Sequence, residues 1–149
     1  MKILVLGGTR FFGKKLVELC LKNNHDVTIL TRGQSGNPFG AQVQQLSVDR
    51  NDVEALTKAL ATTTWDIVYD NICYSPNEAQ KIAQILQNKT KKLVFTSTLS
   101  TYEADGKMKS ETDFNPYDYE IRMGDRDDFT YGEGKRQAEG MGRTLQRQA

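Results

Sequence analysis

The segment LGGTRFFG (residues 6–13) joins two stretches of very different hydrophobic pattern. The stretch before it, KILVL (residues 2–6), is a short apolar run of the kind found in strands that are buried on both faces of a sheet. The stretch after it, residues 11–22, repeats apolar side chains at helical spacing, and the pair Asn23 and Asn24 is a typical helix end. The sequence therefore predicts a strand, a glycine turn and a helix in succession.

The same alternation continues along the chain. Apolar runs predict further strands at residues 27–30, 42–46, 67–69 and 93–95, and helical spacing predicts helices at residues 53–60, 76–87 and 133–146. Asp52 is placed to cap the second helix, and Ser75, Pro76 and Glu78 form a typical start of the third. Strands that alternate with helices predict parallel strands joined by right-handed crossovers. We therefore expect the α/β class, with the doubly wound parallel sheet of a Rossmann fold.

Length and charge limit the kind of protein. The chain has 149 residues, a length typical of one domain, and we expect residues 1–149 to form a single domain with an irregular loop region at 99–130. Its 20 Lys and Arg residues nearly balance 19 Asp and Glu residues. No strong electrostatic field therefore draws the chain to a polyanion, and a nucleic-acid partner is not expected.

The two cysteines, Cys20 and Cys73, have no spacing typical of a zinc site or a redox pair. We therefore expect no metal site, reduced thiols and a cytoplasmic location. The apolar run at the N-terminus is too short for the core of a signal peptide or for a spanning helix, so no membrane association is expected.

The glycine turn stands where the pyrophosphate of a dinucleotide would meet the N-terminus of a helix. The residues expected to hold it are Gly7, Gly8, Thr9, Arg10, Phe11, Phe12 and Gly13. Gly8 would make the tight turn, and Gly13 would let the helix approach the strand. The usual motif has glycine where this chain has Arg10, whose Cβ must point away from the phosphates while its guanidinium binds one. The alternative is a turn that only reverses the chain.

The end of the second predicted strand bears on the choice of dinucleotide. Domains that prefer NAD usually present an acidic residue there to the 2′-hydroxyl of the ribose, whereas this chain has Arg32. Arg32 can pair with a 2′-phosphate, and Arg10 would assist it. NADP(H) is therefore favoured as the cofactor, with NAD(H) as the alternative. A solvated surface arginine is the other interpretation of Arg32.

Six segments taken together resemble the short-chain dehydrogenase/reductase superfamily, and within it the extended and atypical NAD-dependent epimerase/dehydratase family. They are LVLGGTRFFG, VTILTRG, SVDRND, VYDNICYSPNEA, KKLVFTSTLSTYEADG with the later SETDFNP, and FTYGEGKRQAE. They span nearly the whole chain in the order that the family has. The resemblance covers the N-terminal, cofactor-binding portion of the family, and it implies that the C-terminal region that forms the substrate pocket is absent from this chain.

The resemblance also implies catalytic roles. Tyr131 would be the general acid and base, and Lys135, one helical turn away, would stabilise its phenolate and donate to the nicotinamide ribose. Thr98 would orient the carbonyl or hydroxyl group of the substrate through its own hydroxyl. The alternatives are an aromatic side chain at a helix start for Tyr131 and an ordinary residue at a strand end for Thr98.

One further cofactor contact is implied by the same resemblance, and another follows from the predicted sheet. Asp49 would accept a hydrogen bond from the amino group of the adenine, although it could equally belong to a cluster that caps the next helix. Asn71 follows the fourth strand at the carboxyl edge of the sheet, where we expect the backbone to contact the cofactor.

The implied function is that of an NAD(P)-binding domain from an epimerase/dehydratase-type oxidoreductase. It would act on a sugar nucleotide or a similar carbinol or carbonyl substrate, and we expect an enzyme that forms homo-oligomers, because a missing final strand would leave a sheet edge exposed. The alternative is a non-catalytic module that binds NAD(P) or RNA and has a regulatory role. An enzyme needs both Tyr131 and Lys135, whereas a binding module would tolerate their loss.

Overall fold

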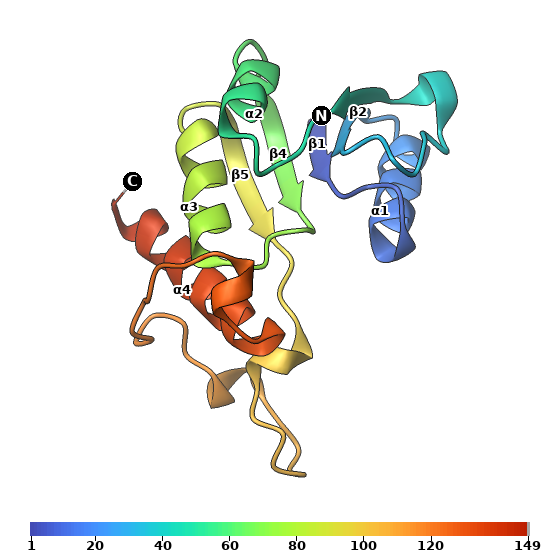
Figure 1. Cartoon of the computed structure of the whole chain (residues 1–149). Helices are drawn as coiled ribbons and strands as arrows, with labels where there is room; N and C mark the ends of the chain where they lie inside the picture. The colour runs from blue at the N-terminus through green and yellow to red at the C-terminus, as the bar shows by residue number, and fades with distance from the viewer. Residues whose placement is uncertain (149) are drawn as a thin grey trace. The chain divides into compact units, whose positions relative to one another are not determined.

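The computed structural model describes residues 1–148, and it describes side chains as far as residue 142. The chain forms two compact units, each built from two stretches of sequence (Figure 1). Unit 1 contains Met1–Ile72 and Ile85–Thr96, and unit 2 contains Cys73–Gln84 and Ser97–Ala149. The assignment of the whole chain to a single domain stays a prediction.

Unit 1 is built on a parallel sheet of five strands. The strands are β1 (Lys2–Leu6), β2 (Asp26–Thr31), β3 (Gln44–Ser47), β4 (Trp65–Asp70) and β5 (Thr90–Phe95). Their order in the sheet is β3-β2-β1-β4-β5, and every neighbouring pair is parallel. The order reverses at β1, which is the topological switch point at which doubly wound sheets bind ligands. The predicted fold class is confirmed.

The register of the sheet places three strand ends in a row. Leu6 at the end of β1 is paired with Leu30 of β2 on one side and with Asp70 of β4 on the other. The glycine turn after β1 and the loop after β4 therefore begin at the same edge of the sheet. This edge carries most of the residues that the sequence predicts to bind a dinucleotide.

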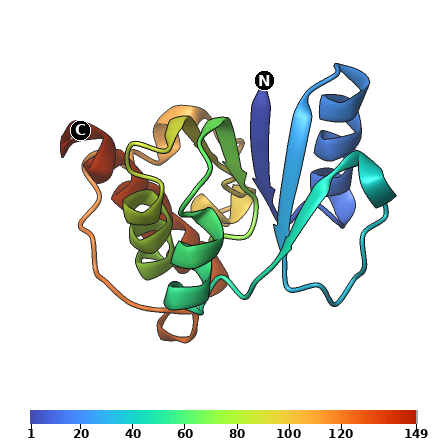
Figure 2. The same cartoon turned by 90° about the horizontal axis from the view of Figure 1, so that it is seen from above.

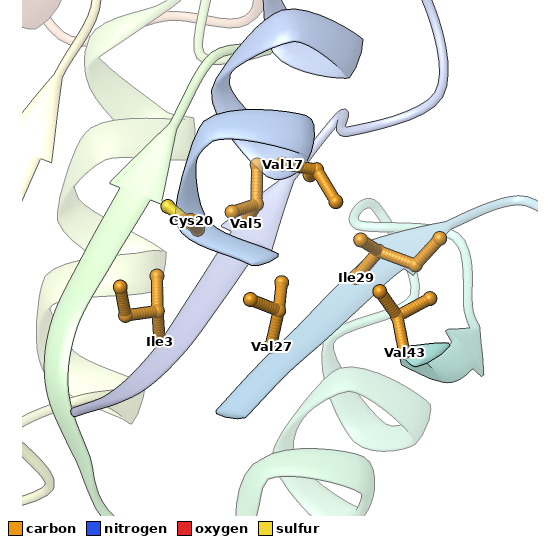
Figure 3. Packing of buried hydrophobic residues seen from close by; sticks show 7 residues of the cluster. All are labelled: Ile3, Val5, Val17, Cys20, Val27, Ile29 and Val43. Carbon is orange, nitrogen blue, oxygen red and sulfur yellow. The ribbon is translucent and has the colours of Figure 1, made fainter. Parts of the chain in front are cut away.

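Helices cover both faces of this sheet within unit 1. Helix α1 (Phe11–Lys22) lies on one side of β1 and β2, and α2 (Val53–Leu60) lies on the other (Figure 2). One core cluster joins α1 to the sheet; its members, which point toward one another in Figure 3, are Ile3, Val5, Val17, Cys20, Val27, Ile29 and Val43. Burial of each such aliphatic side chain contributes about 1.5–3 kcal/mol. The predicted burial of the first strand on both faces is also confirmed, since Leu4 and Leu6 are fully buried.

Unit 2 holds two longer helices and the segment that the sequence predicts as irregular. The helices are α3 (Pro76–Ile85), which belongs to this unit as far as Gln84, and α4 (Tyr131–Gln148). Between them, residues 99–130 contain three short 3₁₀ helices, η2 (Leu99–Thr101), η3 (Glu111–Asp113) and η4 (Arg126–Asp128). An earlier one, η1 (Gly40–Gln42), replaces the first residue of the third predicted strand, which begins at Gln44 instead.

Side chains of α4 hold this loop segment in place. The hydroxyl of Tyr119 donates to the carboxylate of Glu133, and the amide of Gln137 donates to the same carboxylate at 2.8 Å. Arg136 donates from Nε to the carbonyl oxygen of Thr101 at 2.6 Å. Hydrogen bonds to α4 thus position parts of a segment that has no hydrophobic period.

Two glycines of α4 lie where the backbone of another segment packs closely against the helix. A Cβ at Gly132 would lie 2.4 Å from the carbonyl oxygen of Ser100, and one at Gly134 would lie 2.4 Å from that of Tyr74. Each glycine costs the helix about 1 kcal/mol relative to alanine. In return, the missing side chains let the backbone of Ser100 and of Tyr74 approach α4 more closely than any side chain would permit.

Candidate functional site

The glycine turn in unit 1 is tightly built. Gly7 has a left-handed φ of 81° and donates to the carbonyl oxygen of Leu30 at 3.1 Å. The sequence predicts the tight turn at Gly8, whereas the left-handed backbone lies at Gly7. A Cβ at Gly13 would lie 2.3 Å from the carbonyl oxygen of Gly7, so α1 can pack against the turn only if residue 13 has no side chain.

Arg10 departs from the usual motif without backbone strain. It occupies the N-cap of α1 with φ −132° and ψ 156°, an extended conformation that any residue adopts. Its neighbour Phe11 carries the unusual left-handed φ of 47°, and its side chain is 88% exposed. The N–H groups of the first helical turn need acceptors from outside the helix, and no side chain that the structure describes caps them. This end of α1 therefore offers donors to an anion.

Asn71 directs a hydrogen-bond donor at the same turn. Its backbone N–H donates to Leu6 at the end of β1, and its Oδ1 accepts from the hydroxyl of Thr96 at 2.8 Å. Its Nδ2 is buried, has no hydrogen-bond partner among the described residues, and lies 3.3 Å from the place that a Cβ at Gly13 would take. A buried donor without an acceptor costs about 1–3 kcal/mol. The side chain of Asn71 thus places a donor without an acceptor at the turn, where the sequence predicts only backbone contacts.

The remaining predicted residues of unit 1 lie where β2 and β3 end. Arg32 is exposed and is followed by Gly33, whose N–H donates to the hydroxyl of Thr31 at 3.1 Å. Asp49 is exposed and accepts from the N–H of Asn51 at 2.9 Å. Asp52 caps α2 by accepting from Ala55, as predicted. The capping role therefore belongs to Asp52, and Asp49 presents its carboxylate in the turn before it.

Unit 2 contains all three residues with predicted catalytic roles. Tyr131 is the first residue of α4 and is 54% exposed, whereas Lys135 is 2% exposed. The ammonium of Lys135 donates to the carbonyl oxygen of Cys73 at 2.9 Å. Thr98 caps η2, with its hydroxyl accepting from Ser100 at 3.3 Å. Their catalytic roles stay a prediction.

A pocket of roughly 270 Å³ lies beside Tyr131 in the same unit. Its lining residues are Tyr74, Arg126, Phe129, Thr130 and Tyr131. The rings of Tyr74 and Tyr131 are 5.9 Å apart between centroids and tilted by 45°, which is a favourable aromatic contact. The guanidinium of Arg126 lies 4.4 Å above the ring of Tyr74, within the range of a cation–π interaction.

Three side chains of this pocket region are not predicted from the sequence as functional groups: those of Tyr74, Glu78 and Arg126. Glu78 is 4% exposed, accepts from the N–H of Tyr74 at 2.7 Å and pairs with Nε of Arg126. The Ser-Pro-Asn-Glu start of α3 pointed to Glu78 only as a capping residue. No spacing rule connects it with Arg126, 48 residues later, so the pair is visible only in three dimensions.

Within residues 1–148, no group of histidine, cysteine and acidic side chains has the arrangement to hold a metal ion. In the same range, none of the helices combines the length and the apolar character that crossing a membrane requires.

The chain belongs to the NAD dependent epimerase/dehydratase family, whose model matches residues 3–149. The resemblance inferred from the six segments is confirmed. A curated relative is the chloroplast stem-loop binding protein of 41 kDa b from Arabidopsis thaliana, which is 30% identical over 116 residues. That match covers 68% of this chain and 30% of the plant protein.

Solved structures of similar fold include several epimerases. A UDP-glucose 4-epimerase superposes with a TM-score of 0.77 and 19% identity, covering 100% of this chain and 48% of the other. The enzyme WbmG of Bordetella bronchiseptica, in complex with NAD, gives a TM-score of 0.69 and 18% identity, covering 97% and 49%. At these identities the likeness shows the fold. The chain spans about half the length of these structures.

Proposed function

We propose that this chain is the dinucleotide-binding portion of an epimerase/dehydratase-type oxidoreductase that prefers NADP(H) and acts on a sugar nucleotide or a similar carbinol or carbonyl substrate. The observation that carries the proposal is the turn after β1, where the N-terminus of α1 and the unpartnered amide of Asn71 offer donors to one ligand. A dinucleotide pyrophosphate supplies the acceptors that the first N–H groups of α1 lack.

The residues present fit such a cofactor. Gly7 and Gly13 keep the turn close to the helix, and the open donors of α1 would hold the pyrophosphate. Arg32, exposed at the end of β2, would pair with a 2′-phosphate, and Asp49 would accept from the adenine amino group. A bound nicotinamide dinucleotide would supply the hydride acceptor or donor.

The proton chemistry is assigned to unit 2. Tyr131 would take the hydroxyl proton of the substrate at its phenolic oxygen and return it in the reverse direction. Lys135 would stabilise the phenolate, and Thr98 would orient the reacting oxygen. The pocket beside Tyr131 would bind the ring that carries the reacting carbon, because three aromatic rings and a guanidinium balanced by Glu78 favour a ring without its own charge.

Titration of NADPH and NADH into the chain, followed by nicotinamide fluorescence, tests the proposal. We expect both to bind and NADPH to bind more tightly. Tyr131→Phe should leave either affinity within about twofold of wild type while it removes hydride transfer to any substrate that the protein turns over. Tyr117→Phe, another exposed tyrosine, is the matched control and should change neither. Absence of binding by wild type would overturn the proposal.

A second candidate function comes from the name of the plant relative, which is a stem-loop binding protein. This chain would then bind RNA hairpins without catalysis. The near-neutral net charge gives little attraction for phosphates, so we place this function second. Binding of a labelled RNA hairpin that weakens steeply with salt, together with no dinucleotide binding, would favour it over the enzyme.

The expected homo-oligomer and cytoplasmic location also stay proposals. Strands β3 and β5 are the edges of the five-stranded sheet, and an edge strand offers backbone groups to another chain. Light scattering after size exclusion would give the oligomeric state.

A further inference from the structure

A buried ion pair crosses the carboxyl edge of the sheet in unit 1. The guanidinium of Arg50 binds both carboxylate oxygens of Asp70, with Nη1 to Oδ1 at 2.8 Å and Nη2 to Oδ2 at 3.0 Å. The two side chains are 5% and 2% exposed. Arg50 lies in the loop after β3, and Asp70 is the last residue of β4. Because β2 and β1 lie between those strands, the pair joins two loops that the sheet itself keeps apart.

Each member of the pair is next to a residue with a proposed role in cofactor binding. Asp49 directly precedes Arg50, and Asn71 directly follows Asp70. Oδ1 of Asp70 also accepts from the N–H of Ile72 at 3.2 Å, so the carboxylate fixes the backbone on the far side of Asn71. The bidentate contact thus sets the position of the Asp49 loop and of Asn71 with respect to each other.

Stability alone does not account for such a pair. Removing two charges from water costs about as much as their attraction returns, and a pair of well-packed apolar residues usually stabilises a fold equally well or better. The bidentate contact between the planar guanidinium and the carboxylate, however, fixes the relative orientation of the two groups, which apolar packing does not.

We propose that Arg50 and Asp70 are positioning residues that hold Asp49 and Asn71 at the spacing that a dinucleotide requires. This inference rests on the proposed function, since it assigns the pair to the same ligand. Without the Arg50–Asp70 pair, the ligand would have to bring the two loops together, and part of its binding energy would be lost to that ordering.

The test separates position from stability by comparing single and double variants of the chain. Arg50→Met leaves the Asp70 carboxylate buried and unpaired, so we expect the Tm to fall by on the order of 10 °C. Arg50→Met/Asp70→Leu removes both charges, so we expect the Tm to return to within a few degrees of the wild-type value. The affinity of the double variant for NADPH should nevertheless stay about tenfold or more below that of wild type.

Lys91→Met is the matched control. It breaks the pair between Lys91 and Asp66, which lies near the opposite end of β4, and it should leave the affinity unchanged. A double variant that regains stability and binds NADPH as tightly as wild type would overturn the positioning role of the pair but not the proposed function. Failure of wild type to bind any dinucleotide would overturn the proposed function, and this inference with it.

Discussion

The ammonium of Lys135 donates a hydrogen bond of 2.9 Å to the carbonyl oxygen of Cys73, and it lies 4.8 Å from the centroid of the Tyr74 ring. The segment before α3 therefore holds the buried charge of α4 through one carbonyl dipole and one aromatic face. Any catalytic role of Lys135 is combined with a structural one.

This double role predicts a clear loss of stability in Lys135→Ala. The change removes a charge-assisted hydrogen bond and leaves the carbonyl oxygen of Cys73 without this donor, so we expect the free energy of unfolding to fall by about 1.5–3 kcal/mol. Urea unfolding followed by circular dichroism measures it. Tyr131→Phe changes only an exposed hydroxyl and should stay within about 0.5 kcal/mol of wild type. Equal stability of Lys135→Ala and wild type would contradict the structural role.

Arg32→Ala should reduce the preference for NADPH over NADH. A bidentate contact between arginine and phosphate contributes about 1.5–3 kcal/mol, so the affinity for NADPH should fall by roughly one to two decades while that for NADH changes little. Fluorescence titrations with both cofactors measure the two affinities. Lys15→Ala, whose side chain is 80% exposed on α1, serves as the control for general loss of positive charge. Wild type with equal affinities for the two cofactors would refute the assignment of Arg32.

Gly13→Ala should abolish dinucleotide binding and destabilise the chain. The added methyl group would lie 2.3 Å from the carbonyl oxygen of Gly7, so either α1 or the turn must move. Gly142→Ala is the matched control, because, apart from the adjacent backbone of α4, nothing among the residues that the structure describes lies within 4 Å of the Cβ that it adds. That variant should be more stable than wild type by up to about 1 kcal/mol, since alanine favours a helix. Thermal unfolding and NADPH titration of both variants would show the contrast, and normal binding by Gly13→Ala would contradict the geometry of the turn.

The stability of unit 2 should depend on pH through Glu133. Burial alone raises the pKa of this carboxyl, but hydrogen bonds from Gln137, Tyr119 and Arg136 outweigh burial and hold the pKa below its ordinary value of 4.5. A carboxyl with a lowered pKa stabilises the folded state above its unfolded pKa, and the contribution is lost as the pH falls through the folded pKa.

Glu133→Gln should therefore destabilise the chain at neutral pH and make its stability less sensitive to acid below about pH 4.5. Unfolding by urea at neutral pH and at about pH 3 measures both effects. Glu103→Gln, an exposed acidic residue of the same unit, is the control and should behave as wild type. A Glu133→Gln variant that loses stability on acidification as steeply as wild type would count against the hydrogen-bonded carboxylate.

The sequence predicts the sheet better than it predicts the site. Strands and helices are predicted by the period of their apolar residues and by residues typical of their ends, such as Asn23 and Asp52. The helices at these two residues begin and end close to the expected bounds. The Arg50–Asp70 and Glu78–Arg126 pairs carry no such local signal, because each joins residues that only the folded chain brings together.

The glycine turn shows the same limit on a smaller scale. The position of the turn between a strand and a helix predicts that it exists. The left-handed backbone of Gly7, however, goes with a hydrogen bond to Leu30 and close packing against Ile72, and these residues come from two other segments. Asn71 is similar: its place after the fourth strand is readable from the sequence, whereas the missing partner of its amide is not.

The division of the chain into units has a consequence for dissecting the molecule. Because each unit is made of two separated stretches, the backbone passes from one unit to the other three times, after residues 72, 84 and 96. No single cut yields either unit intact, and a fragment that stops after β4 would lack the edge strand β5. During synthesis β5 emerges only after the whole of α3, so the sheet of unit 1 cannot be completed before the first stretch of unit 2 has been made. Separate expression of the two units would require rejoining the chain in a different order.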